Sequence, residues 1–417
     1  MVWKKSYRIT RCKQLSADYA DYTESFLRNL WMDLMIENRH RNEFPTLFTG
    51  IHLLSHSLGP VPRAARDSML SYIDAWEHHT SEDAWATSWW TLSRRVGDRI
   101  AVILGGEPGS VQIQPNASLA MATVASCFDF NKGRNKVVTT ALDFPSMEYF
   151  WEAQRQIGAR VEVVPSADGI SVPLERILDA IDNETALVAL AHTSYCSSYR
   201  IDARAIVEHA HAKGALVLLD VYQSAGVLQL NATDWNVDFL IGGTIKWLCG
   251  GPSCGYLYVR PDLQRDLKPR LTGWVAHDSP FDFAHAPMRY ARSVRRFAQG
   301  TPSIPALYSA MPGLEIIEAV GIADIAAESQ RRTQLMIDFA SERGWTINTP
   351  REKTQRGGSV MIGVKDGPTM VERLAERRVF VDSRPSAGLR ISPHFFNTDE
   401  EVEEALNTLA ELMNSQI

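Results

Sequence analysis

The sequence predicts an α/β protein in which a mostly parallel sheet is covered by helices, with a smaller α+β region beyond it. Between residues 92 and 260, short apolar runs alternate with helical patterns, which is typical of βα units in a parallel sheet. These runs are bounded by Gly and Pro and are continuously apolar, so we expect strands that are buried on both faces. A chain of 417 residues, 45% hydrophobic and 22% charged, is long enough for a large domain with a smaller one attached.

The predicted elements of the first part follow a regular order. Residues 11–45 have the periodicity of an amphipathic helix, and residues 51–54 predict a short strand. The large region then predicts helix 64–76, helix 92–104, strand 111–114, helix 119–130, strand 136–140, helix 147–157, strand 160–164, helix 174–181, strand 186–191, helix 203–213, strand 216–220, strand 237–241 and strand 255–259.

The C-terminal region begins after an irregular, basic stretch over residues 262–304. A long helical pattern covers 306–342 and is broken near Gly321. It is followed by strand 345–349, strand 358–364, helix 368–377, strand 379–382, strand 389–392 and helix 398–414. We therefore expect a large domain over residues 51–305, and a small α+β domain formed by residues 1–50 together with 306–417.

The composition argues against several classes of protein. A net charge of −6 provides no electrostatic basis for binding nucleic acid or an anionic membrane. The five cysteines lack metal-site spacing, so we expect no metal site and reduced thiols. No apolar run reaches membrane-spanning length, and the first residues lack the apolar core of a signal peptide. We expect a cytoplasmic protein that does not enter the membrane.

An aspartate and a lysine at the ends of neighbouring apolar runs are the strongest sign of chemistry. Asp220 ends the run 215–220, and Lys246 follows the run 237–241 through Gly-Gly-Thr. Burying two charged groups for packing alone is costly, and ligands bind beyond the carboxyl ends of parallel strands. We expect both groups to face one ligand. The aspartate suits a protonated ring nitrogen, and burial helps a neutral lysine attack a carbonyl.

Two turns offer further partners for this ligand. Ser118, in Asn116-Ala117-Ser118, opens a helix, where backbone N–H groups and a hydroxyl bind an anion such as phosphate. Phe144 follows a strand and is placed to stack on a planar ring. Taken singly, these features also suit an N-cap serine, a core phenylalanine, a satisfied carboxylate and a surface lysine. Taken together, they are what pyridoxal 5′-phosphate requires.

The order of these motifs resembles class V of the fold-type I pyridoxal-phosphate enzymes, and within that class kynureninase most. The matching stretches are Ser57-Leu58-Gly59, Ala117-Ser118, Phe144-Pro145-Ser146, Asp220-Val221-Tyr222-Gln223, Lys246-Trp247-Leu248, Gly273-Trp274-Val275-Ala276-His277, Gly300-Thr301-Pro302 and Gly388-Leu389-Arg390-Ile391-Ser392-Pro393. The resemblance implies the fold-type I fold, pyridoxal 5′-phosphate as cofactor and a small amino acid as substrate. It also implies a homodimer whose active sites are shared across the interface.

The resemblance further implies a role for each matched residue. Lys246 would carry the cofactor as a Schiff base, and Asp220 would contact its ring nitrogen. Trp274 and His277 would line the pocket for the substrate's side chain, and Arg390 would hold its α-carboxylate. The full set is Ala117, Ser118, Phe144, Ser194, Asp220, Gln223, Lys246, Trp274 and Thr301 for the cofactor, with Ser57, Arg390 and His277 for the substrate.

Several positions depart from kynureninase. His56 replaces the Asn of the entrance motif, Met147 replaces an acid, and Ile245 replaces a tyrosine that precedes the lysine. Thr301 stands where kynureninase has an asparagine that contacts the aromatic substrate. Gln223 replaces a histidine and is the choice of aminotransferases, desulfurases and epimerases of the class. These changes affect the substrate more than the cofactor.

Three functions are therefore open. The leading hypothesis is a kynureninase-like hydrolase or lyase that cleaves the Cβ–Cγ bond of an amino acid. The first alternative is a class V aminotransferase, epimerase or β-eliminating lyase of a biosynthetic pathway. A remote alternative is a non-catalytic binding protein with the same fold. Class V desulfurase chemistry is not expected, because it needs a cysteine in the last third of the chain and the last cysteine here is Cys254.

A cluster of Trp85, Trp89 and Trp90 has two explanations. It predicts either a core or interface plug, or one wall of a substrate pocket.

Overall fold

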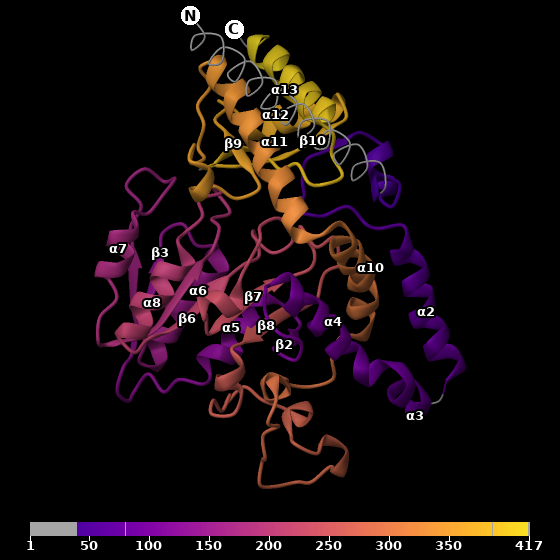
Figure 1. Cartoon of the computed structure of the whole chain (residues 1–417), viewed down its shortest axis with the longest axis vertical. Helices are drawn as coiled ribbons and strands as arrows, with labels where there is room; N and C mark the ends of the chain where they lie inside the picture. Colours follow the sequence, from indigo (N-terminus) through magenta and orange to yellow (C-terminus); the bar gives the residue numbers. More distant parts are fainter. Residues whose placement is uncertain (1–39, 80, 386, 416–417) are drawn as a thin grey trace, which may run out of the picture.

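The computed structural model describes residues 40–79, 81–385 and 387–415 (Figure 1). The helix predicted over 11–45 therefore lies mostly outside the described residues. Figure 1 shows two parts: a large α/β part, and a smaller part that carries the C-terminal helices. A large α/β part with a smaller part beside it agrees with the fold class that the sequence predicts.

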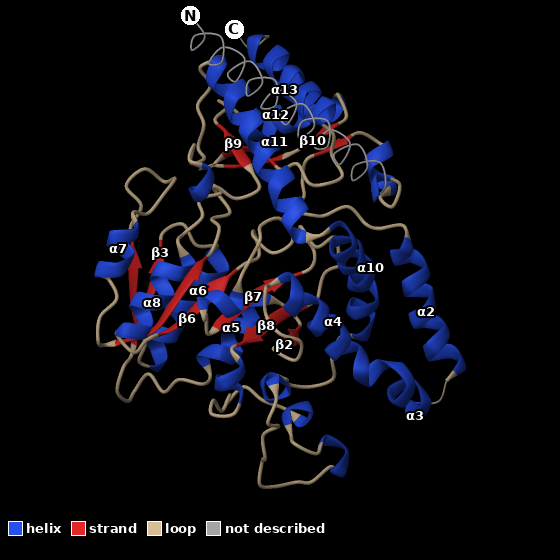
Figure 2. Ribbon diagram, viewed as in Figure 1, coloured by secondary structure: helices blue, strands red, loops and turns tan. Residues whose placement is uncertain are grey.

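Seven strands of the large part form one sheet between layers of helices (Figure 2). In spatial order they are β2 (Val111–Gln114), β8 (Gly255–Val259), β7 (Phe239–Gly243), β6 (Leu216–Asp220), β5 (Thr185–Ala191), β3 (Lys136–Thr140) and β4 (Arg160–Val164). Within this sheet β8 alone runs against its neighbours. The other pairs are parallel. The predicted α/β class with a mostly parallel sheet is confirmed.

Helices cover both faces of the sheet because its strands are apolar on both sides. Consecutive residues Leu218 and Leu219 of β6, for example, enter two different hydrophobic clusters. One cluster takes side chains from α5 (Ala117–Ala125) and α6 (Pro145–Gln154). The other takes them from α4 (Trp90–Ile103), α7 (Leu174–Asp179), α8 (Ala203–Ala212) and α10 (Ile304–Val320). The continuous apolar runs of the sequence are explained by this double burial.

The smaller part has a hydrophobic core of its own. Its helices are α11 (Ile322–Glu342), α12 (Gly367–Glu376) and α13 (Asp399–Asn414). Its strands are β9 (Val360–Ile362), β11 (Asp382–Arg384) and β12 (Gly388–Ile391), which are antiparallel, and the parallel pair β1 (Ile51–His52) and β10 (Val379–Phe380). Thr398 and Glu401 form a capping box that fixes the start of α13.

The packing places two elements, α10 and β1, on the other side of the expected boundaries at residues 305 and 51. Helix α10 packs on α4 and on α2 (Ala64–His78), and it contributes Leu307 and Leu314 to the core of the large part. Gly321, with φ +93°, separates it from α11. Strand β1 pairs with β10 and so belongs to the small part. The irregular stretch before residue 306 resembles a linker in the sequence, but the apolar side chains after it complete the large core.

Two further differences concern the small part. Residues 345–349 form no strand, and Ile347 makes only an isolated bridge with Ile362. The predicted strand 379–382 divides into β10 and the first residue of β11, and β11 continues to Arg384 although Asp, Ser and Arg have low strand propensity. It forms because it pairs with β12, where Asp382 lies opposite Arg390.

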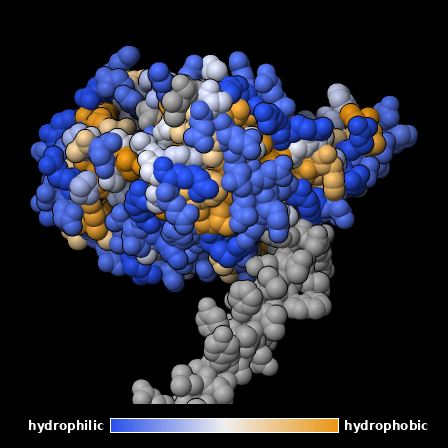
Figure 3. Space-filling model, turned by 90° about the horizontal axis from the view of Figure 1, so that it is seen from above, coloured by the Kyte–Doolittle hydropathy of each residue, from blue (hydrophilic) through white to orange (hydrophobic). Residues whose placement is uncertain are grey.

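The face shown in Figure 3 is mainly hydrophilic, with apolar side chains in small groups. Among the described residues, none of the helices combines the length and the apolar character that a membrane crossing needs.

Candidate functional site

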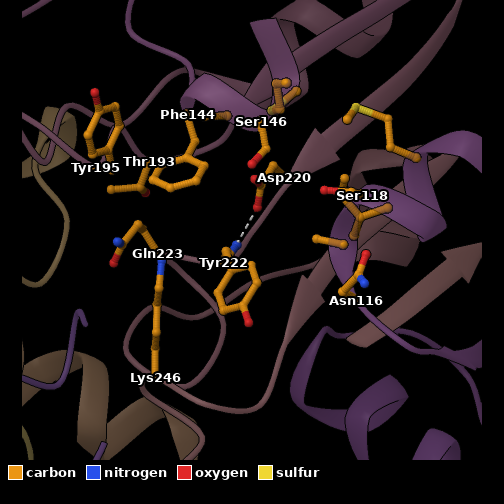
Figure 4. A pocket seen from close by; sticks show the side chains of 15 residues that line it. Asn116, Ser118, Phe144, Ser146, Thr193, Tyr195, Asp220, Tyr222, Gln223 and Lys246 are labelled. Carbon is orange, nitrogen blue, oxygen red and sulfur yellow. Dashed lines mark hydrogen bonds between the residues drawn. The ribbon is translucent and has the colours of Figure 1, made fainter. Parts of the chain in front are cut away.

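A cavity opens where β5 and β6 end (Figure 4). Its lining comes from α5, from the turn after β3, from the strand ends and from the turn after β7. The lining residues are Asn116, Ala117, Ser118, Met121, Phe144, Ser146, Met147, Ala191, Thr193, Tyr195, Asp220, Tyr222, Gln223, Ile241 and Lys246. Those also singled out from the sequence are Ala117, Ser118, Phe144, Asp220, Gln223 and Lys246.

Asp220 is the last residue of β6, and its side chain is buried at the cavity wall. One carboxylate oxygen, Oδ1, accepts a hydrogen bond from the backbone N–H of Tyr222 at 2.8 Å (Figure 4). Burial raises the pKa of Asp220, while the Tyr222 N–H and the charge of Lys246 act in the opposite direction. A carboxylate held in this way is suited to pair with a protonated ring nitrogen.

Lys246 lies just beyond β7, and its amine faces aromatic rings. The Nζ atom is 4.3 Å from the ring centroid of Tyr222 and 5.7 Å from that of Phe144. Burial lowers the pKa of Lys246 to about 8, against the charge of Asp220, which raises it. Among the described residues, none forms a hydrogen bond with Nζ. The amine is therefore partly neutral near pH 8 and available to a carbonyl carbon.

Phe144 follows a turn that Asp143 fixes. The Asp143 carboxylate accepts hydrogen bonds from the backbone N–H groups of Thr140, at 2.8 Å, and Ala191, at 2.7 Å. It thereby joins the ends of β3 and β5. Phe144 packs edge-on against Tyr195, with 5.1 Å between ring centroids, and stays 42% exposed. Part of the ring is therefore open to a planar ligand.

The N-terminus of α5 forms another wall of the cavity. The side chain of Asn116 caps the helix by accepting a hydrogen bond from the Leu119 N–H at 2.9 Å. Ser118 lies in the first turn, and in Figure 4 it stands across the cavity from Gln223. Gly255 of β8 approaches closely, since a Cβ there would lie 2.7 Å from the Asn116 Cα. This helix start has the N–H groups and the hydroxyl that a phosphate needs.

The Gln223 amide is held on both sides. Its Oε1 accepts from the indole N–H of Trp247 at 3.1 Å, and its Nε2 donates to the backbone oxygen of His56, also at 3.1 Å. These two partners fix which end of the amide is which.

Arg390 lies beside the cavity lining and is buried, with 3% of the residue exposed. Its Nη1 donates to the backbone oxygen of Tyr195 at 3.0 Å. Its charge is among those that lower the pKa of Lys246, after burial and the opposing Asp220. The guanidinium contacts the cavity wall through Tyr195, which lines the cavity. Ser57 is half-buried next to His56 and is not among the lining residues.

Other predicted site residues lie away from the cavity of their own chain. The Ser194 hydroxyl donates to the backbone oxygen of Leu142 at 3.1 Å, whereas its neighbours Thr193 and Tyr195 line the cavity. The Ser194 side chain thus supports the turn at Leu142 and does not line the cavity. Thr301 is exposed.

Trp274 and His277 lie on a loop that packs elsewhere. The ring of Trp274 is 5.8 Å from that of Trp90 at the start of α4. The Nδ1 atom of His277 accepts from the N–H of Ser279 at 3.1 Å. Of the tryptophan cluster, Trp85 and Trp89 pack against the large core, and none of the three lines the cavity. The core or interface explanation of that cluster is thus favoured.

Some residues that line the cavity are not among those expected from the sequence. Thr193, Tyr195 and Tyr222 each follow the end of a buried strand, so the rule that found Asp220 applies to them as well. Met121 faces the cavity from the second turn of α5, and no sequence signal separates it from a core residue.

The residues present fit pyridoxal 5′-phosphate. Asp220 suits its ring nitrogen, the open face of Phe144 suits its ring, and the start of α5 suits its phosphate. The amine of Lys246, which no described residue engages in a hydrogen bond, is left for its carbonyl group.

Comparisons with known proteins agree with this fit. The family model described as Aminotransferase class-V matches residues 94–404. The chain is 32% identical over 384 residues to "Uncharacterized aminotransferase YcbU" of Bacillus subtilis (strain 168), which covers 90% of this chain and 98% of that protein. It is 30% identical to the kynureninase of Pseudomonas fluorescens, covering 87% of this chain and 89% of that protein.

Solved structures support the fold. A cysteine desulfurase from Thermococcus onnurineus NA1 superimposes with a TM-score of 0.80 at 20% identity, covering 91% of this chain and 98% of that one. This likeness concerns the fold alone. The family model matches most of the length of this chain, and the similar proteins named above agree with it. We therefore conclude that the chain belongs to the aminotransferase class-V family of pyridoxal-phosphate-dependent enzymes.

Proposed function

We propose that this enzyme acts as a hydrolase or lyase that cleaves the side chain of an α-amino acid at Cβ–Cγ, as a kynureninase would. The observation that carries the proposal is the partly neutral amine of Lys246, which lies in one cavity with Asp220 and the open face of Phe144. The 30% identity to a kynureninase over most of the chain supports this reaction within the family.

The residues divide the work by position. When bound, pyridoxal phosphate supplies an electron-accepting ring. Asp220 keeps the proton on the ring nitrogen, and Phe144 holds the ring's plane. Because burial lowers the pKa of Lys246, a fraction of its amine is neutral, and this neutral amine takes up the substrate's α-proton and later returns it. Arg390 binds the α-carboxylate and so orients the bond to be broken.

The direct test is alanine release from L-kynurenine and from 3-hydroxykynurenine by protein purified with its cofactor. We expect release by the wild type and none by Lys246→Ala. If neither compound yields alanine while both perturb the absorption of the bound cofactor, the reaction assignment is wrong and the cofactor assignment stands.

A second candidate is an aminotransferase of the same class. Gln223 and Met147, in place of the histidine and the acid of kynureninase, both line the cavity and favour it. Transfer of an amino group from an amino acid to a 2-oxo acid would identify this activity. A lyase would produce no such transfer at a comparable rate.

We also propose that two copies of the chain form a homodimer with shared sites. Trp274, His277 and Thr301 do not line the cavity of their own chain, and the aromatic side chains of Phe281 and Phe283 on the same loop are exposed. Such side chains suit burial in an interface. A mixture of Lys246→Ala and Thr301→Arg subunits should form hybrids with one intact site and regain part of the activity that each variant lacks. The absence of recovery in hybrids shown to form would contradict shared sites.

A further inference from the structure

A partly buried network lies beside the cavity and involves residues that the proposed mechanism does not use. Both oxygens of the Asp382 carboxylate accept hydrogen bonds from the Arg390 guanidinium: Nε donates to Oδ1 at 2.8 Å, and Nη2 donates to Oδ2. The ring of His56 lies on the same carboxylate, with Nε2 2.8 Å from Oδ1. Arg384, which is more exposed, approaches Oδ2 at 3.2 Å. Asp382 is thus the centre to which these groups converge.

The partners of His56 determine where its protons are. An ionised carboxylate only accepts hydrogen bonds, so Nε2 must carry a proton and donate it to Asp382. The other ring nitrogen, Nδ1, lies 2.5 Å from the hydroxyl of Ser392, which in turn lies 2.7 Å from that of Ser359. Burial lowers the pKa of His56 to about 4, so the ring is neutral at pH 7 and Nδ1 accepts from Ser392. Asp382 has the opposite tendency, since its hydrogen bonds with His56 and Arg390 overcome burial and lower its pKa.

The network leaves part of Arg390 available. A guanidinium has five N–H groups. Asp382 takes two and the backbone oxygen of Tyr195 takes one, so among the described residues one N–H remains on each terminal nitrogen. These two N–H groups, one on Nη1 and one on Nη2, can donate to the two oxygens of one carboxylate.

Backbone structure fixes this arrangement from two sides. Asp382 and Arg390 are paired residues of neighbouring strands, β11 and β12, so the sheet sets the distance between them. His56 comes from the segment after β1, and its backbone oxygen accepts from the Gln223 amide. The same residue therefore contacts the carboxylate network through its ring and a cavity residue through its backbone.

We propose that Asp382 and His56 are positioning residues that hold the Arg390 guanidinium in the orientation in which its two remaining N–H groups bind a substrate carboxylate. The inference rests on the proposed role of Arg390. It goes beyond that role because it assigns a purpose to β11 and to the histidine that stands in place of the entrance-motif asparagine. Asp382 balances the buried charge of Arg390 and fixes its plane, while His56 fixes Asp382.

L-Alanine and ethylamine provide the test, because they differ only in the carboxylate. Binding of each to the cofactor-loaded enzyme is followed by the change in the visible absorption of the cofactor. We expect Asp382→Asn to weaken the binding of L-alanine by about 10- to 100-fold, as when a charge-assisted hydrogen bond is loosened. The binding of ethylamine should be unchanged. His56→Gln should have a smaller effect of the same kind, and the double variant should be no worse than Asp382→Asn, because His56 acts through Asp382.

The controls separate the possible failures. Glu372→Gln removes an exposed negative charge from the same part of the molecule and should change neither affinity. If Arg390→Gln abolishes the preference for L-alanine but Asp382→Asn does not, Arg390 is the anchor and the positioning inference is overturned. If wild type shows no preference, or Arg390→Gln leaves it intact, the anchor role and the inference both fail. Equal losses for L-alanine and ethylamine in Asp382→Asn would show a merely structural role. If Asp382→Asn does not fold, the same comparisons decide with His56→Gln.

Discussion

The indole N–H of Trp247 donates to the side-chain oxygen of Gln223 at 3.1 Å. The residue that follows Lys246 in the chain therefore fixes the amide of another cavity residue. The backbone oxygen of Trp247 in turn accepts from the Nε2 of His394, at 2.9 Å, in the small part of the molecule. The turn that carries the lysine is thus tied both to the cavity and to the C-terminal region.

Replacement of Trp247 by Phe should cost stability and loosen the cofactor. The ring contacts are largely kept, but the buried amide oxygen of Gln223 loses its donor, at a cost of about 1–3 kcal/mol. We expect a lower free energy of unfolding in urea and weaker cofactor binding. Trp151→Phe is the matched control, because Trp151 is equally buried and its N–H forms no hydrogen bond among the described residues. Equal losses in the two variants would show that the hydrogen bond contributes nothing.

The reactivity of Lys246 should rise with pH, and the midpoint of this rise should lie at an unusually low pH for a lysine. Since burial lowers its pKa to about 8, the neutral amine accumulates as the pH rises through about 8, well below the ~10.4 of an exposed lysine. Labelling of the cofactor-free protein with acetic anhydride, followed at this residue by mass spectrometry against Nα-acetyllysine, measures the midpoint. Asp220→Asn should shift it further down, because the Asp220 charge raises the pKa. A midpoint near that of the free amino acid would contradict the burial of this amine.

Loss of the Asp143 carboxylate should affect both stability and the cofactor. In Asp143→Ala the backbone N–H groups of Thr140 and Ala191 lose their acceptor, which we expect to destabilise the protein by about 2–4 kcal/mol. Because Phe144 follows directly, its ring should lose its fixed orientation, and cofactor affinity should fall as well. Calorimetry and cofactor titration measure the two effects. Asp143→Asn keeps one acceptor and should lie between the wild type and Asp143→Ala.

The large sheet and the centre of the site were predictable because they depend on local signals. Buried strands such as 216–220 are continuous apolar runs, and Asp220 and Lys246 stand where those runs end. Charged groups at such positions require a partner, which points to a ligand whatever the details of packing. The same reasoning extends to Phe144 and Ser118, which both line the cavity.

What could not be predicted depends on contacts between distant segments. Strand β11 exists because Asp382 lies opposite Arg390, a pairing that no local propensity reveals. Helix α10 joins the large core through its packing on α2 and α4, although irregular sequence precedes it. The side chain of Ser194 faces Leu142, while its neighbours on either side face the cavity. These residues follow the end of β5, where no regular alternation shows which side chain faces the cavity.

A methyl group at Gly255 should weaken the phosphate side of the cavity. The added Cβ would lie 2.7 Å from the Asn116 backbone, so the turn that opens α5 must move away from β8. Because backbone N–H groups bind phosphate only in a fixed direction, we expect Gly255→Ala to lose more affinity for pyridoxal phosphate than for pyridoxal, which lacks the phosphate. Gly363→Ala is the control, since its Cβ would crowd Thr346 in the small part at 2.9 Å. An equal loss for both ligands in Gly255→Ala would mean that the phosphate does not bind at the start of α5.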